Sequence, residues 1–292
     1  MNIIVSIQGG LGKSVMATAF CRAIRNQYPN DTIIVLTAYP EVFSNSPVIN
    51  FVFGHSEETY FFSKYIENQN SLIFANEPYL VTEHIYRRES VAETFCKMNG
   101  VAFNGELPEI FINEREFNFF QNKYPSDKPI MVIQTNGGAA QSTDMKYSWA
   151  RDIPRNVVNG VIEEFRSKYK IFHIRREDQL GYDHTTPIQD TFKGIACLIA
   201  RSQKRLFMDS FGQHTAAALN KKSTVLWIAN SPRVFGYSIN DNILPNPETV
   251  RADLKYSLFG RYNIIGTPNE FPYRSENEIF DVDKVITSLV NQ

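Results

Sequence analysis

A strand, a glycine-rich turn, a helix and a second strand follow one another at the start of the chain. Asn2–Ile7 is an apolar run rich in isoleucine and valine, and Gly9–Gly12 provides the turn. From Lys13 onwards apolar residues recur every three to four positions, as in an amphipathic helix, until Pro29. Thr32–Leu36 is a second apolar run. Two strands joined by a helix form the βαβ unit of a parallel sheet, so we predict an α/β fold.

The same alternation restarts in the second half of the chain. Tyr124–Pro129 carries two prolines in six residues, a composition typical of a linker. We therefore predict two domains, 1–124 and 129–292, and the last helix could pack back on the first domain. The strands expected in the second domain are Ile130–Gln134, Lys170–Ile174, Arg205–Met208 and Thr224–Ile228. In such sheets ligands bind beyond the carboxyl ends of the strands.

Composition excludes several classes of protein. The chain has 30 Lys and Arg against 31 Asp and Glu, which argues against a strongly basic nucleic-acid-binding protein. Hydrophobic residues make up 43% of the chain, enough for a large core, but no apolar run approaches the ~20 residues of a membrane span. The N-terminus lacks the basic region of a signal peptide, and the three cysteines are scattered, so we expect a cytoplasmic protein. The histidines lack metal-ligand spacing, so we expect no metal site.

The first glycine-rich turn allows three interpretations. Gln8–Ser14 approaches the phosphate-loop pattern GxxxxGK[ST], but Ile7 stands where that pattern has its first glycine. Glycines that lead into a helix N-terminus favour an anion, because backbone N–H groups and the helix dipole point toward it. The segment is therefore an ATP-type loop, a substrate-facing loop between the domains, or a tight structural turn.

A second strand-to-helix turn lies at Asp209–Gly212. The predicted strand ends at an acidic residue, Ser210 and Gly212 make the turn, and an alanine-rich helix follows directly. Backbone N–H groups of its first turn would suit a diphosphate. The alternative is that Asp209 and Ser210 only cap the helix.

At this point the sequence resembles a known family. Asp209–Trp227, followed by the proline-containing loop Asn230–Tyr237, is similar to a segment of the family 9 glycosyltransferases, the ADP-heptose:lipopolysaccharide heptosyltransferase group. Lys146–Trp149 resembles the family's Lys-x-Trp element, and residues 1–53 resemble its opening. The resemblance touches both domains in order and is weakest over residues 55–125.

The resemblance implies a GT-B fold, in which two Rossmann-like domains face each other across a cleft. The first domain would bind a hydroxyl acceptor such as a glycan, and the second a nucleotide-diphosphate-sugar donor, with no metal or other cofactor. The acceptor-side loop would be Gly9, Gly10, Leu11 and Gly12; the donor-binding residues would be Lys146, Ser210, Phe211, Gly212, Gln213 and His214. Asp209 would lie near the transferred sugar. A histidine one turn into a helix can also be structural.

One residue departs from the family pattern. The family places an aspartate, its proposed general base, where this chain has Lys13. An ammonium group acts as a base only if its pKa falls far below ~10.4. We name Lys13 and Asp209 as the catalytic candidates. Glu41, His55 and Glu83 are the other residues that could replace the missing base. The alternative functions are a P-loop nucleotide hydrolase that uses Gln8–Ser14 and an inactive nucleotide-sugar- or glycan-binding protein.

Overall fold

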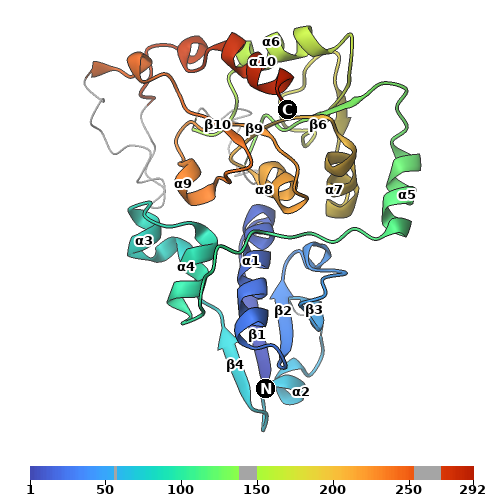
Figure 1. Ribbon diagram of the computed structural model, residues 1–292, viewed down its shortest axis with the longest axis vertical. Coiled ribbons are helices and arrows are strands. Elements are labelled where there is room, and N and C mark those ends of the chain that lie inside the picture. Colours follow the sequence, from blue (N-terminus) through green and yellow to red (C-terminus); the bar gives the residue numbers. More distant parts are fainter. Residues whose placement is uncertain (56–57, 138–149, 253–270) are drawn as a thin grey trace. The chain divides into compact units, whose positions relative to one another are not determined.

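The computed structural model describes the whole chain except residues 56–57, 138–149 and 253–270 (Figure 1). The chain divides into two compact units, unit 1 (Met1–Glu114) and unit 2 (Arg115–Gln292). Each unit is built on its own parallel β-sheet. Within the described ranges, none of the helices is long and apolar enough to cross a membrane.

Unit 1 contains a four-stranded parallel sheet with the order β3-β2-β1-β4. Its strands are β1 (Asn2–Ile7), β2 (Thr32–Thr37), β3 (Phe51–Gly54) and β4 (Ser71–Phe74). The first two strands confirm the predicted βαβ unit, because they pair in parallel and are joined by α1 (Leu11–Gln27). Since β1 lies between β2 and β4, the chain extends the sheet from β1 in both directions.

One face of this sheet is covered by helices. Phe20 of α1 lies against Phe74 of β4, with ring centroids 5.6 Å apart, and stacks at 5.3 Å on Phe95 of α4 (Val91–Met98). Shorter helical segments fill the connections: α2 (Phe61–Tyr65), α3 (Thr82–Ile85) and the 3₁₀ turns η1 (Pro40–Val42) and η2 (Pro78–Leu80). The buried rings of Phe20, Phe74 and Phe95 pack α1 and α4 against the sheet.

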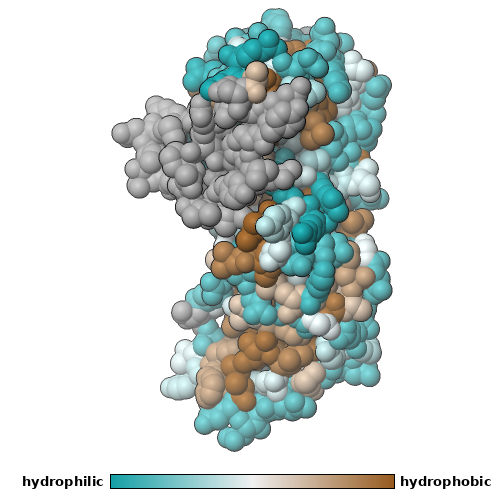
Figure 2. Space-filling view, turned by 90° about the vertical axis from the view of Figure 1, so that its left-hand side faces the viewer, coloured by the Kyte–Doolittle hydropathy of each residue, from teal (hydrophilic) through white to brown (hydrophobic). Residues whose placement is uncertain are grey.

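The opposite face of the unit 1 sheet is partly open. Ile4 pairs in register with Ile34 and Ile73, and Ile34 pairs with Phe51, so these four side chains form one row across the sheet. The two ends of the row, Phe51 and Ile73, are 45% and 49% exposed, whereas Ile4 and Ile34 are buried. Figure 2 shows apolar surface on one side of this unit, in the lower part of the view.

Unit 2 contains a six-stranded parallel sheet with the order β10-β9-β8-β5-β6-β7. Its strands are β5 (Ile130–Ile133), β6 (Lys170–Ile174), β7 (Thr186–Ile188), β8 (Lys204–Met208), β9 (Thr224–Leu226) and β10 (Asp241–Ile243). Numbered within the unit, this is the order 3-2-1-4-5-6 of the Rossmann fold. The predicted α/β class is therefore confirmed in both units.

Helices cover both faces of the unit 2 sheet. On one face α6 (Arg155–Phe165) and α10 (Val282–Val290) enclose a core that includes Met131 and Leu206. On the other face α7 (Phe192–Arg201) and α8 (Phe211–Ala218) enclose a core that includes Val132 and Phe207. The last helix, α10, thus packs on the sheet of its own unit.

The helix before the predicted linker packs within unit 2. This helix, α5 (Glu114–Lys123), ends beside Asp190, which accepts hydrogen bonds from Lys123 Nζ at 2.9 and 3.0 Å and from the Tyr124 hydroxyl. The division between the two units, after Glu114, therefore precedes the Tyr124–Pro129 segment.

Candidate functional site

The order of the strands in unit 2 reverses between β5 and β8, and this reversal marks a place at the carboxyl edge of the sheet. From β5 the chain builds outward to β6 and β7 on one side, and from β8 to β9 and β10 on the other. In open parallel sheets the crevice at such a reversal, outside the strand carboxyl ends, is where ligands bind. Here β5 leads into Gln134, and β8 leads into Asp209 and Ser210.

Gln134 holds the start of α8 in place. Its side-chain Nε2 donates to Ser210 Oγ at 3.1 Å, and its Oε1 accepts from the backbone N–H of Gly212 at 3.0 Å. A Cβ atom at Gly212 would lie only 2.6 Å from that Oε1 atom. Sequence analysis missed Gln134, although a polar residue directly after a buried strand was the available signal.

Arg151 places a cation beside this turn. One of its guanidinium nitrogens, Nη2, donates to the backbone carbonyl of Asp209, and its Nε lies 4.0 Å from Asp209 Oδ2. The Asp209 carboxylate also accepts a hydrogen bond from Asn230 Nδ2, and its side chain is 11% exposed. The Arg151 side chain, in contrast, is 32% exposed, so its charge is within reach of a ligand. Sequence analysis missed this arginine, which lies 58 residues before Asp209.

Ser210 and Phe211 lie at the N-terminal end of α8. Ser210 is the N-cap residue in an extended conformation, and its side chain makes no capping hydrogen bond to the helix. The N–H groups of a first helical turn have no acceptor within the helix; here that of Gly212 donates to Gln134, which leaves those of Phe211 and Gln213 for an anion. This start of α8 therefore has the geometry of an anion site.

The side chains of Gln213 and His214 point into the protein. Gln213 Nε2 donates to the carbonyl of Phe235, at the end of α9 (Pro232–Phe235), at 2.8 Å. His214 Nδ1 lies 2.9 Å from the Tyr237 hydroxyl, and burial lowers the pKa of His214 to about 3. His214 is therefore neutral at pH 7, and both side chains connect α8 to the following loop. Lys146, the other predicted donor residue, lies outside the described residues.

In unit 1 the glycine-rich turn is shaped around Lys13. Gly9 has φ +102°, and a Cβ atom there would lie 2.9 Å from Lys13 Nζ, so both conformation and space favour glycine. Gly10 is the N-cap of α1, and Leu11 and Gly12 are the first residues of the helix. Gly9 therefore leaves room for the Lys13 side chain to lie against the turn.

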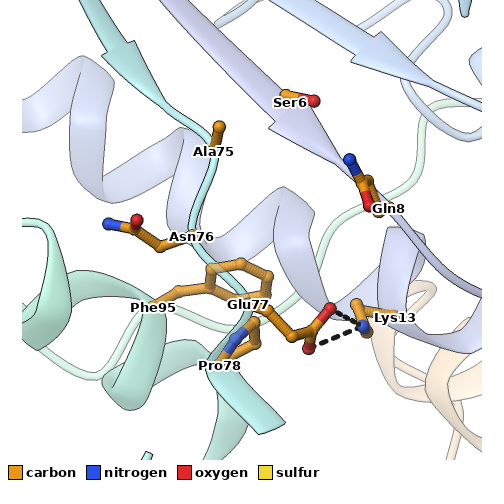
Figure 3. Close-up of a pocket in the computed structure, with 8 residues that line it drawn as sticks. All are labelled: Ser6, Gln8, Lys13, Ala75, Asn76, Glu77, Pro78 and Phe95. Atoms are coloured by element: carbon orange, nitrogen blue, oxygen red, sulfur yellow. Dashed lines mark hydrogen bonds and ion pairs between the residues drawn. The ribbon is translucent and has the colours of Figure 1, made fainter. Parts of the chain in front are cut away.

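The Lys13 ammonium is paired rather than free. Its Nζ donates to both carboxylate oxygens of Glu77, at 2.6 and 2.8 Å (Figure 3). The same Nζ lies 4.1 Å from the centroid of the Tyr79 ring. The Lys13 side chain is 8% exposed. A phosphate-binding lysine needs its charge for the ligand. The sequence analysis did not consider Glu77, which forms an ion pair with Lys13, the residue that departs from the family pattern.

A pocket opens beside this pair. Its cavity volume is about 20 Å³, far below the roughly 300–1,000 Å³ of typical small-molecule sites, so it suits one small polar group such as a hydroxyl and not a whole nucleotide. The residues that line it are Ser6, Gln8, Lys13, Ala75, Asn76, Glu77, Pro78 and Phe95. Glu41, His55 and Glu83, the earlier candidate bases, are not among them. In the part of the chain that the structure describes, no cluster of three or more His, Cys, Asp and Glu could hold a metal ion.

Comparison with known proteins gives matches in structure alone. No protein-family model matches the sequence. No curated protein matches it either. The glycosyl transferase family 9 protein from Veillonella parvula DSM 2008 superposes with a TM-score of 0.68 at 14% identity, over 100% of this chain and 97% of that one.

The chain has the fold of the family 9 glycosyltransferases. E. coli ADP-heptose lps heptosyltransferase II matches with a TM-score of 0.64 and 15% identity, over 84% of this chain and 90% of that one. E. coli heptosyltransferase WaaC with ADP-2-deoxy-2-fluoro heptose matches with a TM-score of 0.55 and 12% identity, over 84% and 94%. The predicted family 9, GT-B fold is confirmed by these likenesses.

Proposed function

We propose that this protein is a glycosyltransferase that moves a sugar from a nucleotide-diphosphate-sugar to a hydroxyl acceptor. The observation that carries the proposal is the start of α8 at the strand reversal of unit 2, with Arg151 beside it, in a chain with the family 9 fold. One of the structures with this fold holds an ADP-sugar analogue. We assign donor binding to unit 2 and acceptor binding to unit 1.

The donor diphosphate would bind at the first turn of α8. Backbone N–H groups of Phe211 and Gln213 would donate to its oxygens, and the positive end of the helix dipole would favour its charge. The Arg151 guanidinium, with its planar array of donors, suits a phosphate in two-point contact. Lys146 is proposed as a second cation.

Transfer requires charge stabilisation on the leaving group. The bond between the anomeric carbon and the diphosphate breaks, and the nucleoside diphosphate leaves with the electron pair. Fixed N–H dipoles and Arg151 would stabilise the charge that develops on the diphosphate oxygens. These groups supply a route for sugar transfer that needs no divalent cation, which we propose for this protein.

The phosphate-loop alternative is less well supported. Lys13 is engaged by Glu77 and Tyr79, and Ile7 replaces the first glycine of that motif. A nucleotide there would have to take the lysine away from a carboxylate that contacts it with both oxygens.

Replacing Arg151 with glutamine should weaken nucleoside-diphosphate binding by about 1–3 kcal/mol, roughly 5- to 150-fold, because a charge-assisted contact is lost. Calorimetric titration with ADP, GDP and UDP in the presence of EDTA measures this. Arg166→Gln is the matched control, since Arg166 pairs with exposed Glu163 on the far end of α6 at 2.7 Å. Equal affinity in the Arg151 and Arg166 variants would remove Arg151 from the donor site.

A further inference from the structure

The Lys13–Glu77 pair lies at a second strand reversal. In unit 1 the chain builds from β1 to β2 and β3 on one side, while β4 joins β1 on the other. Gln8 follows β1, and Asn76 and Glu77 follow β4, so the pocket opens at the carboxyl ends of these two adjacent strands. Unit 1 thus has, like unit 2, a reversal of strand order at the carboxyl ends of its strands, which is where open parallel sheets bind ligands.

We propose that Glu77 is the general base that takes the proton from the acceptor hydroxyl, with Lys13 as its positioning residue. The inference rests on the proposed function and adds to it the residue that activates the acceptor. Lys13 occupies the position to which the family resemblance assigns a carboxylate base, and here the neighbouring strand end supplies the carboxylate instead. The ammonium of Lys13 cannot serve as the base while it donates to both Glu77 oxygens.

The exposure of the two side chains supports this division of roles. The Glu77 side chain is 34% exposed, whereas that of Lys13 is 8% exposed. Of the two side chains, that of Glu77 is therefore the more accessible to a substrate. Figure 3 shows the two side chains facing each other, with the side chain of Gln8 near Lys13.

The hydrogen bonds of Glu77 leave room for a substrate. Its Oε1 accepts from Lys13 and from the backbone N–H of Tyr79 at 3.1 Å, and among the described residues its Oε2 accepts only from Lys13. A carboxylate offers about four acceptor positions, so Oε2 retains one for a hydroxyl proton. The Tyr79 and Lys13 contacts hold the carboxylate in one orientation, which is the requirement for a general base.

The proposed step is a substitution at the anomeric carbon of the donor. The acceptor oxygen forms a bond to the anomeric carbon of the donor, and the bond from that carbon to the diphosphate breaks. The acceptor proton passes to Glu77 Oε2, and the electron pair of the broken bond leaves with the nucleoside diphosphate. Glu77 then returns its proton to solvent.

The test compares two isosteric substitutions in unit 1. Glu77→Gln removes the base, and Glu109→Gln removes a different ion pair, between Glu109 and Arg22 at 2.8 Å. ADP-heptose, UDP-glucose and GDP-mannose are screened, and hydrolysis of the donor that the parent turns over fastest is measured with water as acceptor. We expect Glu77→Gln to lose roughly 10²- to 10⁴-fold in turnover, with nucleoside-diphosphate affinity within twofold of the parent, and Glu109→Gln to retain parental turnover.

A second variant guards against a folding defect. Lys13→Met/Glu77→Gln leaves no unpaired charge, and we expect it to fold and to lose turnover as Glu77→Gln does. Parental turnover in either Glu77 variant, or equal losses in the Glu77 and Glu109 variants, would overturn the assignment of Glu77. A parent protein that binds none of ADP, GDP and UDP would instead overturn the proposed function.

Discussion

Lowering the pH from 7 to 5 should destabilise unit 2 by about 4 kcal/mol, because two buried imidazoles resist protonation. Burial lowers the pKa of His173 and of His214 to about 3, against about 6.5 in the unfolded chain. The unfolded state therefore binds more protons between these values. The stabilisation is fully present above pH 6.5 and is lost as the pH falls toward 3, at up to about 1.4 kcal/mol per pH unit for each histidine.

Tryptophan fluorescence makes this measurement specific to unit 2. Both tryptophans follow residue 114, and Trp227 is fully buried. Urea unfolding at pH 7, 6 and 5 should show a falling midpoint, and His214→Gln should reduce the pH dependence by about half, since one imidazole remains. A midpoint that is constant between pH 7 and 5 would contradict the burial of these neutral rings.

Replacing Gly212 with valine should both destabilise unit 2 and abolish its anion site. The first added carbon would lie 2.6 Å from Gln134 Oε1 and 3.1 Å from the Phe207 ring, so α8 would have to move away from the sheet. Overpacking of this kind costs about 1–3 kcal/mol, and the bond between Gln134 and the Gly212 N–H is lost in addition. We expect nucleoside-diphosphate affinity to fall more than tenfold in calorimetric titration.

A glycine elsewhere in unit 2 provides the control. The three atoms nearest to a Cβ atom at Gly181 all belong to the Arg175 side chain, at 3.3 Å or more, and that side chain can shift. Gly181→Ala should therefore leave stability within about 0.5 kcal/mol and nucleotide affinity unchanged. If Gly212→Val binds nucleotide as well as this control does, the start of α8 is not the donor site.

The sheets could be predicted because buried parallel strands are short, nearly continuous apolar runs. Asn2–Ile7, Lys170–Ile174 and the end of β8 stand out in the sequence for this reason. The place of α5 could not be predicted in the same way. Its attachment to unit 2 depends on the contacts of Lys123 and Tyr124 with Asp190, which lies more than 60 residues away.

The turns that carry the candidate sites were predictable, but the side chains around them were not. The strand–turn–helix pattern at Asp209–Gly212 predicted a helix that starts directly after a strand, and α8 does begin there, at Phe211. The pattern could not tell which side chains face a ligand, and Gln213 and His214 turn inward to bind the α9 loop. The partnerships of Arg151 with Asp209 and of Lys13 with Glu77 join residues 58 and 64 positions apart. Such pairs follow from strand order, which sequence periodicity does not specify.

The most direct test of this account is the titration of the parent protein and of Lys13→Met with ADP, GDP and UDP in EDTA. We predict that at least one of these binds without a metal ion, and that Lys13→Met retains its affinity within about tenfold, or 1.4 kcal/mol. This result would follow if the nucleotide binds at the start of α8 rather than on the Gln8–Ser14 turn. Absence of diphosphate binding in EDTA, together with magnesium-dependent ATP binding that Lys13→Met abolishes, would contradict it.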